Sequence, residues 1–238
     1  MPKQLLLNTP SIGSWITLGH PAIAEIMAEA GFDWLTVDLE HSTITIREAE
    51  DLIRIIELKG VIPLVRLTSN SSEQIKRVMD AGAHGVVVPM VCSGDDARAA
   101  VSAVRYPPVG NRGVGLARAQ GYGSSFETYK RWQESEATVV VQVEHIEAVN
   151  NLEEILTTDG VDAYIVGPYD LSGSMGIPGE FEDSKFIEAM NRIRAIAEQL
   201  KVPGGVHLIE PNPAELLRLV EQGNEFIAYS LDIRMIDI

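Results

Sequence analysis

The sequence predicts an α/β protein in which eight parallel strands alternate with helices and close into a (β/α)8 barrel, the TIM barrel. Three observations support this prediction. Short apolar runs rich in β-branched residues alternate with amphipathic stretches, as in a parallel sheet with crossover helices. The unit recurs at about 30 residues. The length of 238 residues is close to the about 250 residues typical of this barrel, so residues 1–238 are expected to form one domain.

Eight segments are expected as strands: Trp15–Leu18, Trp34–Glu40, Ile62–Leu67, Gly85–Met90, Thr138–Glu144, Ala163–Pro168, Gly204–Leu208 and Phe226–Asp232. Helices are expected at Pro21–Ala30, Ile46–Leu58, Ser72–Ala81, Asp95–Val104, Ile146–Thr157, Lys185–Leu200 and Pro213–Glu221. Several of these helices run into a glycine that can end a helix in the left-handed conformation: Gly31, Gly60, Gly82 and Gly223. An open doubly wound sheet is the alternative fold. It would normally carry a GxGxxG turn after the first strand, and the chain has Leu18-Gly19-His20-Pro21 there.

Two segments break the repeat. A glycine- and proline-rich stretch from Tyr106 to about Gly123 predicts a long loop over one end of the barrel. The sequence ends at Ile238, six residues after the last expected strand, so the eighth helix is expected to be missing or truncated. The barrel face near the first and last strands would then be uncovered, which predicts a homo-oligomer that covers it.

Composition excludes several classes of function. The formal net charge of −15 has the wrong sign for attraction to a nucleic-acid backbone. The longest apolar runs are far shorter than the ~20 residues that span a membrane, and the N-terminal residues lack the apolar core of a secretory signal, so a cytoplasmic protein is expected. Because Cys92 is the only cysteine, neither an intrachain disulfide nor a cage of cysteines around zinc is expected.

Polar residues follow the apolar strands, at the barrel end where such enzymes place their active sites. Glu144 and Asp170 end sequentially adjacent strands with no basic residue beside them, and a hard divalent cation would remove their mutual repulsion. We interpret them as ligands of Mg²⁺, Mn²⁺ or a similar ion. The alternative for Asp170 is an N-cap of the following turn.

Three further residues are candidates for catalysis. Arg66 emerges from an apolar strand and can meet a carboxylate or a developing oxyanion; its alternative role is a structural ion pair with Glu40. His41 is a candidate general base, which Asp80 would orient. The six lysines lie at the N-terminus, in helices or just before strands, so Schiff-base chemistry is disfavoured.

The chain closely resembles the HpcH/HpaI family of metal-dependent, class II pyruvate aldolases, from about Gly13 to Asp232. The matching segments are Gly31-Phe-Asp-Trp-Leu-Thr-Val-Asp-Leu-Glu-His41, Val65-Arg66, Val88-Pro-Met-Val91, Arg105-Tyr-Pro-Pro108, Arg112-Gly-Val-Gly115, Gln142-Val-Glu144 and Gly167-Pro-Tyr-Asp-Leu-Ser172.

The resemblance implies a role for each matching residue. Glu144 and Asp170 would bind the divalent metal (Mg²⁺, Mn²⁺ or Co²⁺), Gln142 would lie beside pyruvate, and Arg66 would contact its keto oxygen. His41, paired with Asp80, would handle protons at the aldehyde end. Backbone N–H groups near Gly167 and in the turn that runs through Pro168 to Asp170 would receive the pyruvate carboxylate. Apart from the resemblance, Trp15, His20, the loop from Pro107 to Gly123 and residues of a neighbouring subunit are candidates for the outer rim that would select the aldehyde. A hexamer built from dimers that exchange C-terminal helices is also implied, although this chain has no such helix.

The expected activity is the reversible cleavage of a 4-hydroxy-2-keto acid to pyruvate and an aldehyde, through a metal-stabilised pyruvate enolate. Two alternatives remain. One is a lyase of the citrate-lyase or malyl-CoA type, which would need a basic groove for CoA. The other is a catalytically silent barrel that acts as a binding subunit, which need not bind a metal.

Overall fold

All eight predicted strands form, and they close into one parallel barrel in the order β1 to β8. The computed structural model describes residues 10–237. The strands are β1 Ser11–Ile16, β2 Trp34–Asp38, β3 Ile62–Arg66, β4 Gly85–Val88, β5 Thr138–Val143, β6 Ala163–Val166, β7 Gly204–Leu208 and β8 Phe226–Leu231. The prediction of a closed (β/α)8 barrel is confirmed, and the open doubly wound alternative is wrong.

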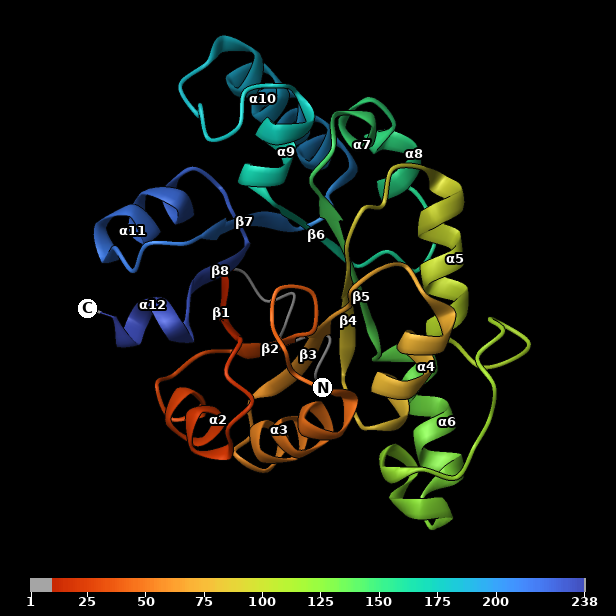
Figure 1. The fold of residues 1–238 in the computed structure, drawn as a ribbon. Coiled ribbons are helices and arrows are strands. Elements are labelled where there is room, and N and C mark those ends of the chain that lie inside the picture. The colour runs from red at the N-terminus through yellow and green to blue at the C-terminus, as the bar shows by residue number, and fades with distance from the viewer. Residues whose placement is uncertain (1–9, 238) are drawn as a thin grey trace.

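Helices surround the ring of strands (Figure 1). They are α2 Pro21–Ala28, α3 Ile46–Leu58, α4 Ser72–Asp80, α5 Gly94–Val104, α6 Phe126–Ser135, α7 Ile146–Asn150, α8 Leu152–Leu156, α9 Pro168–Ser174, α10 Ser184–Leu200, α11 Pro213–Glu221 and α12 Asp232–Ile236, with a 3₁₀ segment η1 at Arg118–Gly123. The four glycines expected to end helices, Gly31, Gly60, Gly82 and Gly223, all have positive φ. None of the helices within residues 10–237 has both the length and the apolar character needed to cross a membrane.

Several expected elements are corrected. The first strand was placed too late, because β1 begins at Ser11 and ends at Ile16. The single helix expected at Ile146–Thr157 is two short helices, α7 and α8. No element was expected at residues 124–137, where the structure has α6. The long loop after Tyr106 is present, but its last part forms η1.

Two apolar layers hold the barrel together. One fills its interior and includes Trp15, Trp34, Leu64 and Phe226; the other lies between the strands and the surrounding helices. The Trp34 and Phe226 rings stack with centroids 4.4 Å apart. Gly13 leaves room for Trp34, because a Cβ atom there would lie 1.9 Å from the indole ring. The interior is therefore a packed core.

The carboxylate of Asp232 joins the first and last strands of the barrel. It accepts the Thr17 hydroxyl at 2.6 Å and the backbone N–H groups of Thr17 and Leu18, each at 2.8 Å. It also accepts the N–H of Ile233 at 2.9 Å. Because Asp232 is buried, these bonds are shielded from water and fix the junction of β8 with β1.

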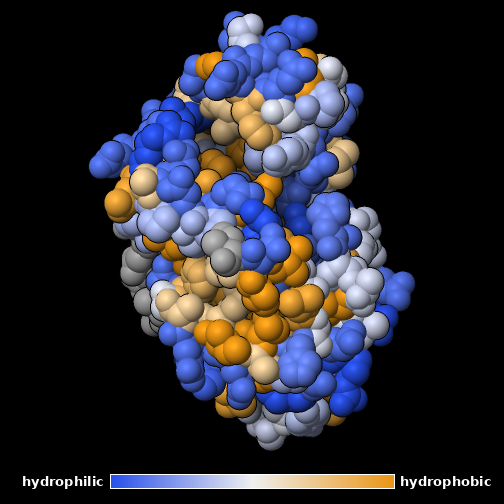
Figure 2. Space-filling model, turned by 60° about the vertical axis from the view of Figure 1, so that its left-hand side comes forward, coloured by the Kyte–Doolittle hydropathy of each residue, from blue (hydrophilic) through white to orange (hydrophobic). Residues whose placement is uncertain are grey.

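The element that follows β8 is short, as expected for a truncated eighth helix: α12 has only five residues and lies between α11 and α2 in Figure 1. Figure 2 shows apolar side chains gathered on this side of the molecule. Exposed apolar residues of these three helices are Ile26, Leu217, Ile233 and Ile236, and Leu18 is exposed just before α2. An apolar area of this kind typically marks an interaction surface.

Candidate active site

A cavity of about 390 Å³ opens at the carboxyl ends of the strands. It brings together seven of the predicted site residues: Trp15, His41, Arg66, Gln142, Gly167, Pro168 and Asp170. They come from β1, β3 and β5 and from the segments after β2 and β6, so residues far apart in the chain meet at one mouth. Glu144 is buried and does not itself line this cavity, but it accepts a hydrogen bond from the side-chain amide of Gln142, which does.

Arg66 is held from two sides. Its Nε donates to Asp38 Oδ1 at 2.9 Å and its Nη2 donates to Asp38 Oδ2 at 2.6 Å. The guanidinium lies over the Trp15 ring, with Cζ 4.4 Å from the centroid. Asp38 and Arg66 are partners in the register of β2 and β3, which explains the bidentate pairing. The remaining terminal nitrogen, Nη1, lies 3.4 Å from Glu40 Oε2.

Sequence reasoning missed the part played by Asp38. It had offered Glu40 as the ion-pair partner of Arg66, and Glu40 is a partner, but Asp38 makes the two short bonds. Burial alone would raise the pKa of Asp38, yet the hydrogen bonds and charge of Arg66, with the N–H groups of Glu40 and His41, hold it below its usual value. The available signal was that both residues end neighbouring strands.

Carboxylates crowd around this arginine. Burial raises the pKa of Glu40 to about 7; the charge of Arg66 opposes the shift, and Glu144, Asp38 and Asp170 add to it. Burial also raises the pKa of Glu144, and Asp170 contributes to the rise, although Glu144 accepts bonds from Gln142 and from the Met90 N–H at 2.7 Å. One arginine therefore faces more negative charge than it can neutralise.

The donor atoms at this mouth suit a hard divalent cation. Asp170 is exposed, and its carboxylate makes no hydrogen bond or salt bridge with any residue in the described range 10–237. It is not an N-cap either, because Gly167 precedes α9 and Asp170 lies within the helix. Gln142 Oε1 and Glu40 Oε2 are buried without a hydrogen-bond partner. Carboxylate and amide oxygen atoms without a hydrogen-bond donor are ligands that Mg²⁺ and Mn²⁺ prefer.

His41 lies at the mouth of the cavity, and its side chain is 62% exposed. Its Nε2 lies 3.7 Å from Glu40 Oε2. Asp80 is not beside it. It is the last residue of α4, which leads back to the amino end of β4, and it faces Arg112 with Oδ1 3.8 Å from Nη1. The expected pairing of His41 with Asp80 therefore does not form within one chain.

His207, for which no role was expected from the sequence, lies in the cavity wall next to Trp15, with ring centroids 5.4 Å apart. Its Nε2 lies 3.2 Å from the carbonyl oxygen of Ser230. A carbonyl oxygen can only accept, so Nε2 carries the proton and Nδ1 is an acceptor. Burial and the nearby Arg66 lower the pKa of His207 to about 4, so the imidazole is neutral at physiological pH.

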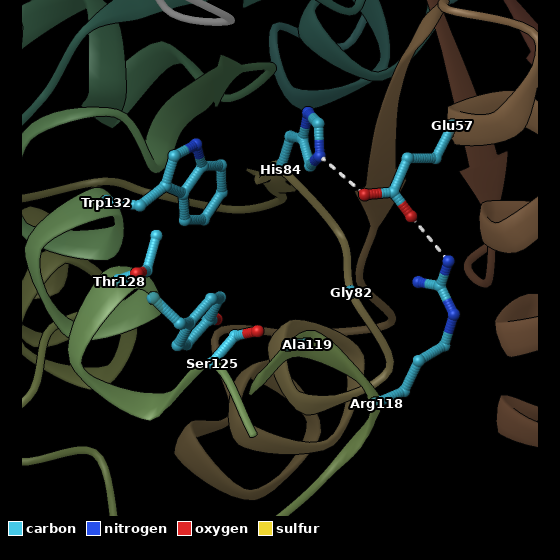
Figure 3. A pocket seen from close by; sticks show the side chains of 9 residues that line it. Glu57, Gly82, His84, Arg118, Ala119, Ser125, Thr128 and Trp132 are labelled. Carbon is cyan, nitrogen blue, oxygen red and sulfur yellow. Dashed lines mark hydrogen bonds and ion pairs between the residues drawn. The ribbon is translucent and has the colours of Figure 1, made fainter. Parts of the chain in front are cut away.

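A second cavity, of about 260 Å³, lies among α3, η1 and α6. Figure 3 shows Glu57 between His84 and Arg118 in this cavity. Glu57 Oε1 lies 3.5 Å from His84 Nε2, and its other oxygen accepts a hydrogen bond from Arg118. The contacts with His84 and Arg118 lower the pKa of Glu57 to about 2, although burial opposes the shift. Its charge is satisfied internally, and none of the predicted site residues lines this cavity.

A closed barrel with charged side chains gathered in a cavity at the carboxyl ends of its strands has the arrangement of a TIM-barrel enzyme. A family model described as HpcH/HpaI aldolase/citrate lyase matches residues 11–236. The chain therefore belongs to this family, and it is a carbon–carbon lyase.

Individual relatives agree with this assignment. The chain is 39% identical over 226 residues to the hydroxypyruvate/pyruvate aldolase of Sagittula stellata, which covers 94% of this chain and 88% of that protein. It is 38% identical over 235 residues to the 4-hydroxy-2-oxo-heptane-1,7-dioate aldolase of Salmonella heidelberg, with 98% and 88% covered. A crystal structure of a HpcH/HpaI family protein from Burkholderia cenocepacia superposes with a TM-score of 0.92 at 33% identity, covering 98% of this chain and 93% of that one.

Proposed function

We propose that this aldolase joins pyruvate to an aldehyde, and cleaves the resulting 4-hydroxy-2-keto acid, with a divalent metal ion held by Glu144 and Asp170. The observation that carries the proposal is the shared cavity, in which Arg66 lies with Gln142, Gly167 and Asp170. Mg²⁺, Mn²⁺ and Co²⁺ are the candidate ions. The bound ion would supply a Lewis acid that polarises the keto group of pyruvate.

Arg66 would stabilise the negative charge that develops on the keto oxygen when a methyl proton leaves. Its Nε and Nη2 donate to Asp38, whereas Nη1 makes only the longer 3.4 Å contact with Glu40 and would be the nitrogen that turns to the substrate. A guanidinium fixed in advance by a buried carboxylate and an indole ring does not have to reorganise as this charge forms. Gln142 would lie beside the bound keto acid, and the segment from Gly167 and Pro168 to Asp170 would receive its carboxylate.

His41 would exchange a proton with the hydroxyl group derived from the aldehyde. Its exposed position at the cavity mouth supports this role, because the aldehyde must enter from the solvent side. In a single chain Asp80 cannot orient His41, since it ends α4 and faces Arg112. The proposed role for Asp80 thus requires a neighbouring subunit. The exposed apolar residues beside α12 support a homo-oligomer, and the family resemblance suggests a hexamer.

The experiment that tests the proposal is incubation of the purified protein with Mn²⁺, pyruvate and a panel of aldehydes, followed by detection of 4-hydroxy-2-keto acids. Hydroxypyruvate should be tested in place of pyruvate as a second nucleophile. The relative from Sagittula stellata is named for both hydroxypyruvate and pyruvate, and His207 Nδ1 offers a hydrogen-bond acceptor in the cavity wall. Absence of products with every pair would contradict the proposal. Turnover of an acyl-CoA instead would favour the alternative of a CoA lyase.

A further inference from the structure

Three side chains able to bind a metal converge beside the candidate active site. Cys92 lies between β4 and α5, His145 follows Glu144 directly, and Glu147 lies in the first turn of α7. One ligand atom from each lies within 4.8 Å of the other two. None of the three lines the cavity that holds Arg66.

The chemistry of this group differs from that of the acidic centre. Thiolate, imidazole and carboxylate together form a donor set of intermediate softness, which suits zinc and cobalt better than magnesium. Ligand atoms about 2.0–2.3 Å from a tetrahedral zinc ion lie about 3.3–3.8 Å from one another. A contraction of about 1 Å would therefore close the group around such an ion, and the fourth position would be open to water.

The backbone around the cysteine is already fixed. The Cys92 N–H donates to Asp96 Oδ2 at 3.1 Å, and the Cys92 carbonyl accepts from Asn151 Nδ2 at 2.8 Å. The segment after β4 is thus tied both to α5 and to the residue between α7 and α8. Binding of an ion would have to order only the three side chains, which lowers the entropic cost of forming the site.

His145 can offer a ring nitrogen to the group. His145 Nδ1 accepts the Glu147 N–H at 3.2 Å and lies 3.9 Å from Glu147 Oε2. Nδ1 is therefore an unprotonated acceptor. An ion could take this lone pair in exchange for one hydrogen bond at the start of a five-residue helix.

The local charge also favours a cation. Burial raises the pKa of the Cys92 thiol, and the carboxylates of Asp96, Glu147 and Glu144 add to this shift. A thiophilic ion would displace the thiol proton and place positive charge among these carboxylates.

We propose that Cys92, His145 and Glu147 form a second metal site, for a thiophilic divalent ion such as Zn²⁺, separate from the acidic centre at Glu144 and Asp170. The ion would clamp the segment after β4 to the segment after β5. These two segments also meet where the Met90 N–H donates to Glu144, so the second site would stiffen the support of an acidic ligand without contacting substrate.

Cobalt titration tests this proposal, because thiolate coordination to Co²⁺ gives an intense near-ultraviolet charge-transfer band and Cys92 is the only cysteine. The full-length protein is titrated with Co²⁺ in excess Mg²⁺, which occupies oxygen-only sites. We expect the band to appear at one equivalent, to vanish in Cys92→Ser, and to need at least about tenfold more Co²⁺ in Glu147→Gln. Glu153→Gln, an exposed carboxylate in neighbouring α8, is the matched control and should behave as wild type.

Zn²⁺ protection provides an independent measurement that requires no variant. Reaction of Cys92 with a thiol reagent should slow at least about tenfold in Zn²⁺ and be unchanged in Mg²⁺. A Co²⁺ spectrum without a charge-transfer band, or equal thiol reactivity with and without Zn²⁺, would overturn the proposal. Neither result depends on aldolase activity, so the test stands apart from that of the proposed function.

Discussion

Replacing Arg66 by alanine should have two separable effects, one on folding and one on rate. The substitution removes two hydrogen bonds from Asp38, at 2.9 and 2.6 Å, and the cation above Trp15. Asp38 is 1% exposed, so its charge would be left buried with only the backbone N–H groups of Glu40 and His41 as partners.

The sizes of the two effects follow from these contacts. Removing one partner of a buried ion pair costs about 3–5 kcal/mol in the free energy of unfolding. Removing a donor to a developing oxyanion lowers turnover by about 10²–10³, equivalent to about 2.7–4 kcal/mol in the activation free energy. The first effect depends on the charge of Asp38, whereas the second does not.

A double variant separates them. Asp38→Asn combined with Arg66→Met removes both charges, so we expect it to be less destabilised than Arg66→Ala while remaining equally slow. The free energy of unfolding is measured in urea, and turnover is measured with Mn²⁺ at a temperature where each variant is folded. Near-normal turnover in Arg66→Ala would reduce Arg66 to a structural partner of Asp38. Equal destabilisation of the single and double variants would refute the argument from an unpaired buried charge.

Four further outcomes are expected. Chelation should abolish activity and Mg²⁺, Mn²⁺ or Co²⁺ should restore it, whereas borohydride with pyruvate should trap no lysine adduct; an adduct would contradict a class II mechanism. His41→Ala should lose aldol cleavage but keep the exchange of pyruvate methyl protons with deuterated water. Glu144→Ala and Asp170→Ala should lose both activities. If His41→Ala also lost the exchange, His41 would be the base that forms the enolate. Folding raises the pKa of Glu40 from 4.5 to about 7, so between these pH values the metal-free folded state binds a proton that the unfolded state does not. The free energy of unfolding should therefore fall as the pH rises from 4.5 to about 7. Glu40→Gln should flatten this pH dependence in urea titrations. Light scattering at micromolar concentration should show a homo-oligomer, and Ile236→Asp should weaken it; a wild-type monomer would refute the interpretation of the apolar face.

The repeating pattern of the sequence was enough to predict the barrel, because every strand after the first is a largely apolar run. The first strand was misplaced since its buried residues include Ser11 and Ser14, and the Ser14 hydroxyl donates to the carbonyl of Ser230, 216 residues away. Helix α6 escaped notice because only Tyr129 and Gln133 are buried on it. A partner as distant in sequence as Ser230 is from Ser14 leaves no local signal, and neither does a helix with so few buried residues.

The candidate site was predictable to the extent that it follows strand ends. Arg66, Gln142 and Asp170 each end or follow a strand, and the structure gathers them in one cavity. Asp80 shows where this reasoning fails, because a helix that follows a strand carries its last residue back to the opposite end of the barrel. The bidentate pairing of Asp38 with Arg66 could not be predicted in the same way, because it depends on the register of β2 against β3, which is set only when the sheet forms.

The bonds of Asp232 have a consequence for synthesis of the chain. Thr17 and its partner Asp232 are separated by 215 residues, and at about 5–20 residues per second a ribosome needs about 11–43 s to add them. Throughout that interval β1 can pair with β2 along one edge, but its other edge lacks its final partner, β8. The nascent protein therefore carries an open sheet edge, a template for pairing with other chains, until β8 and Asp232 have been added.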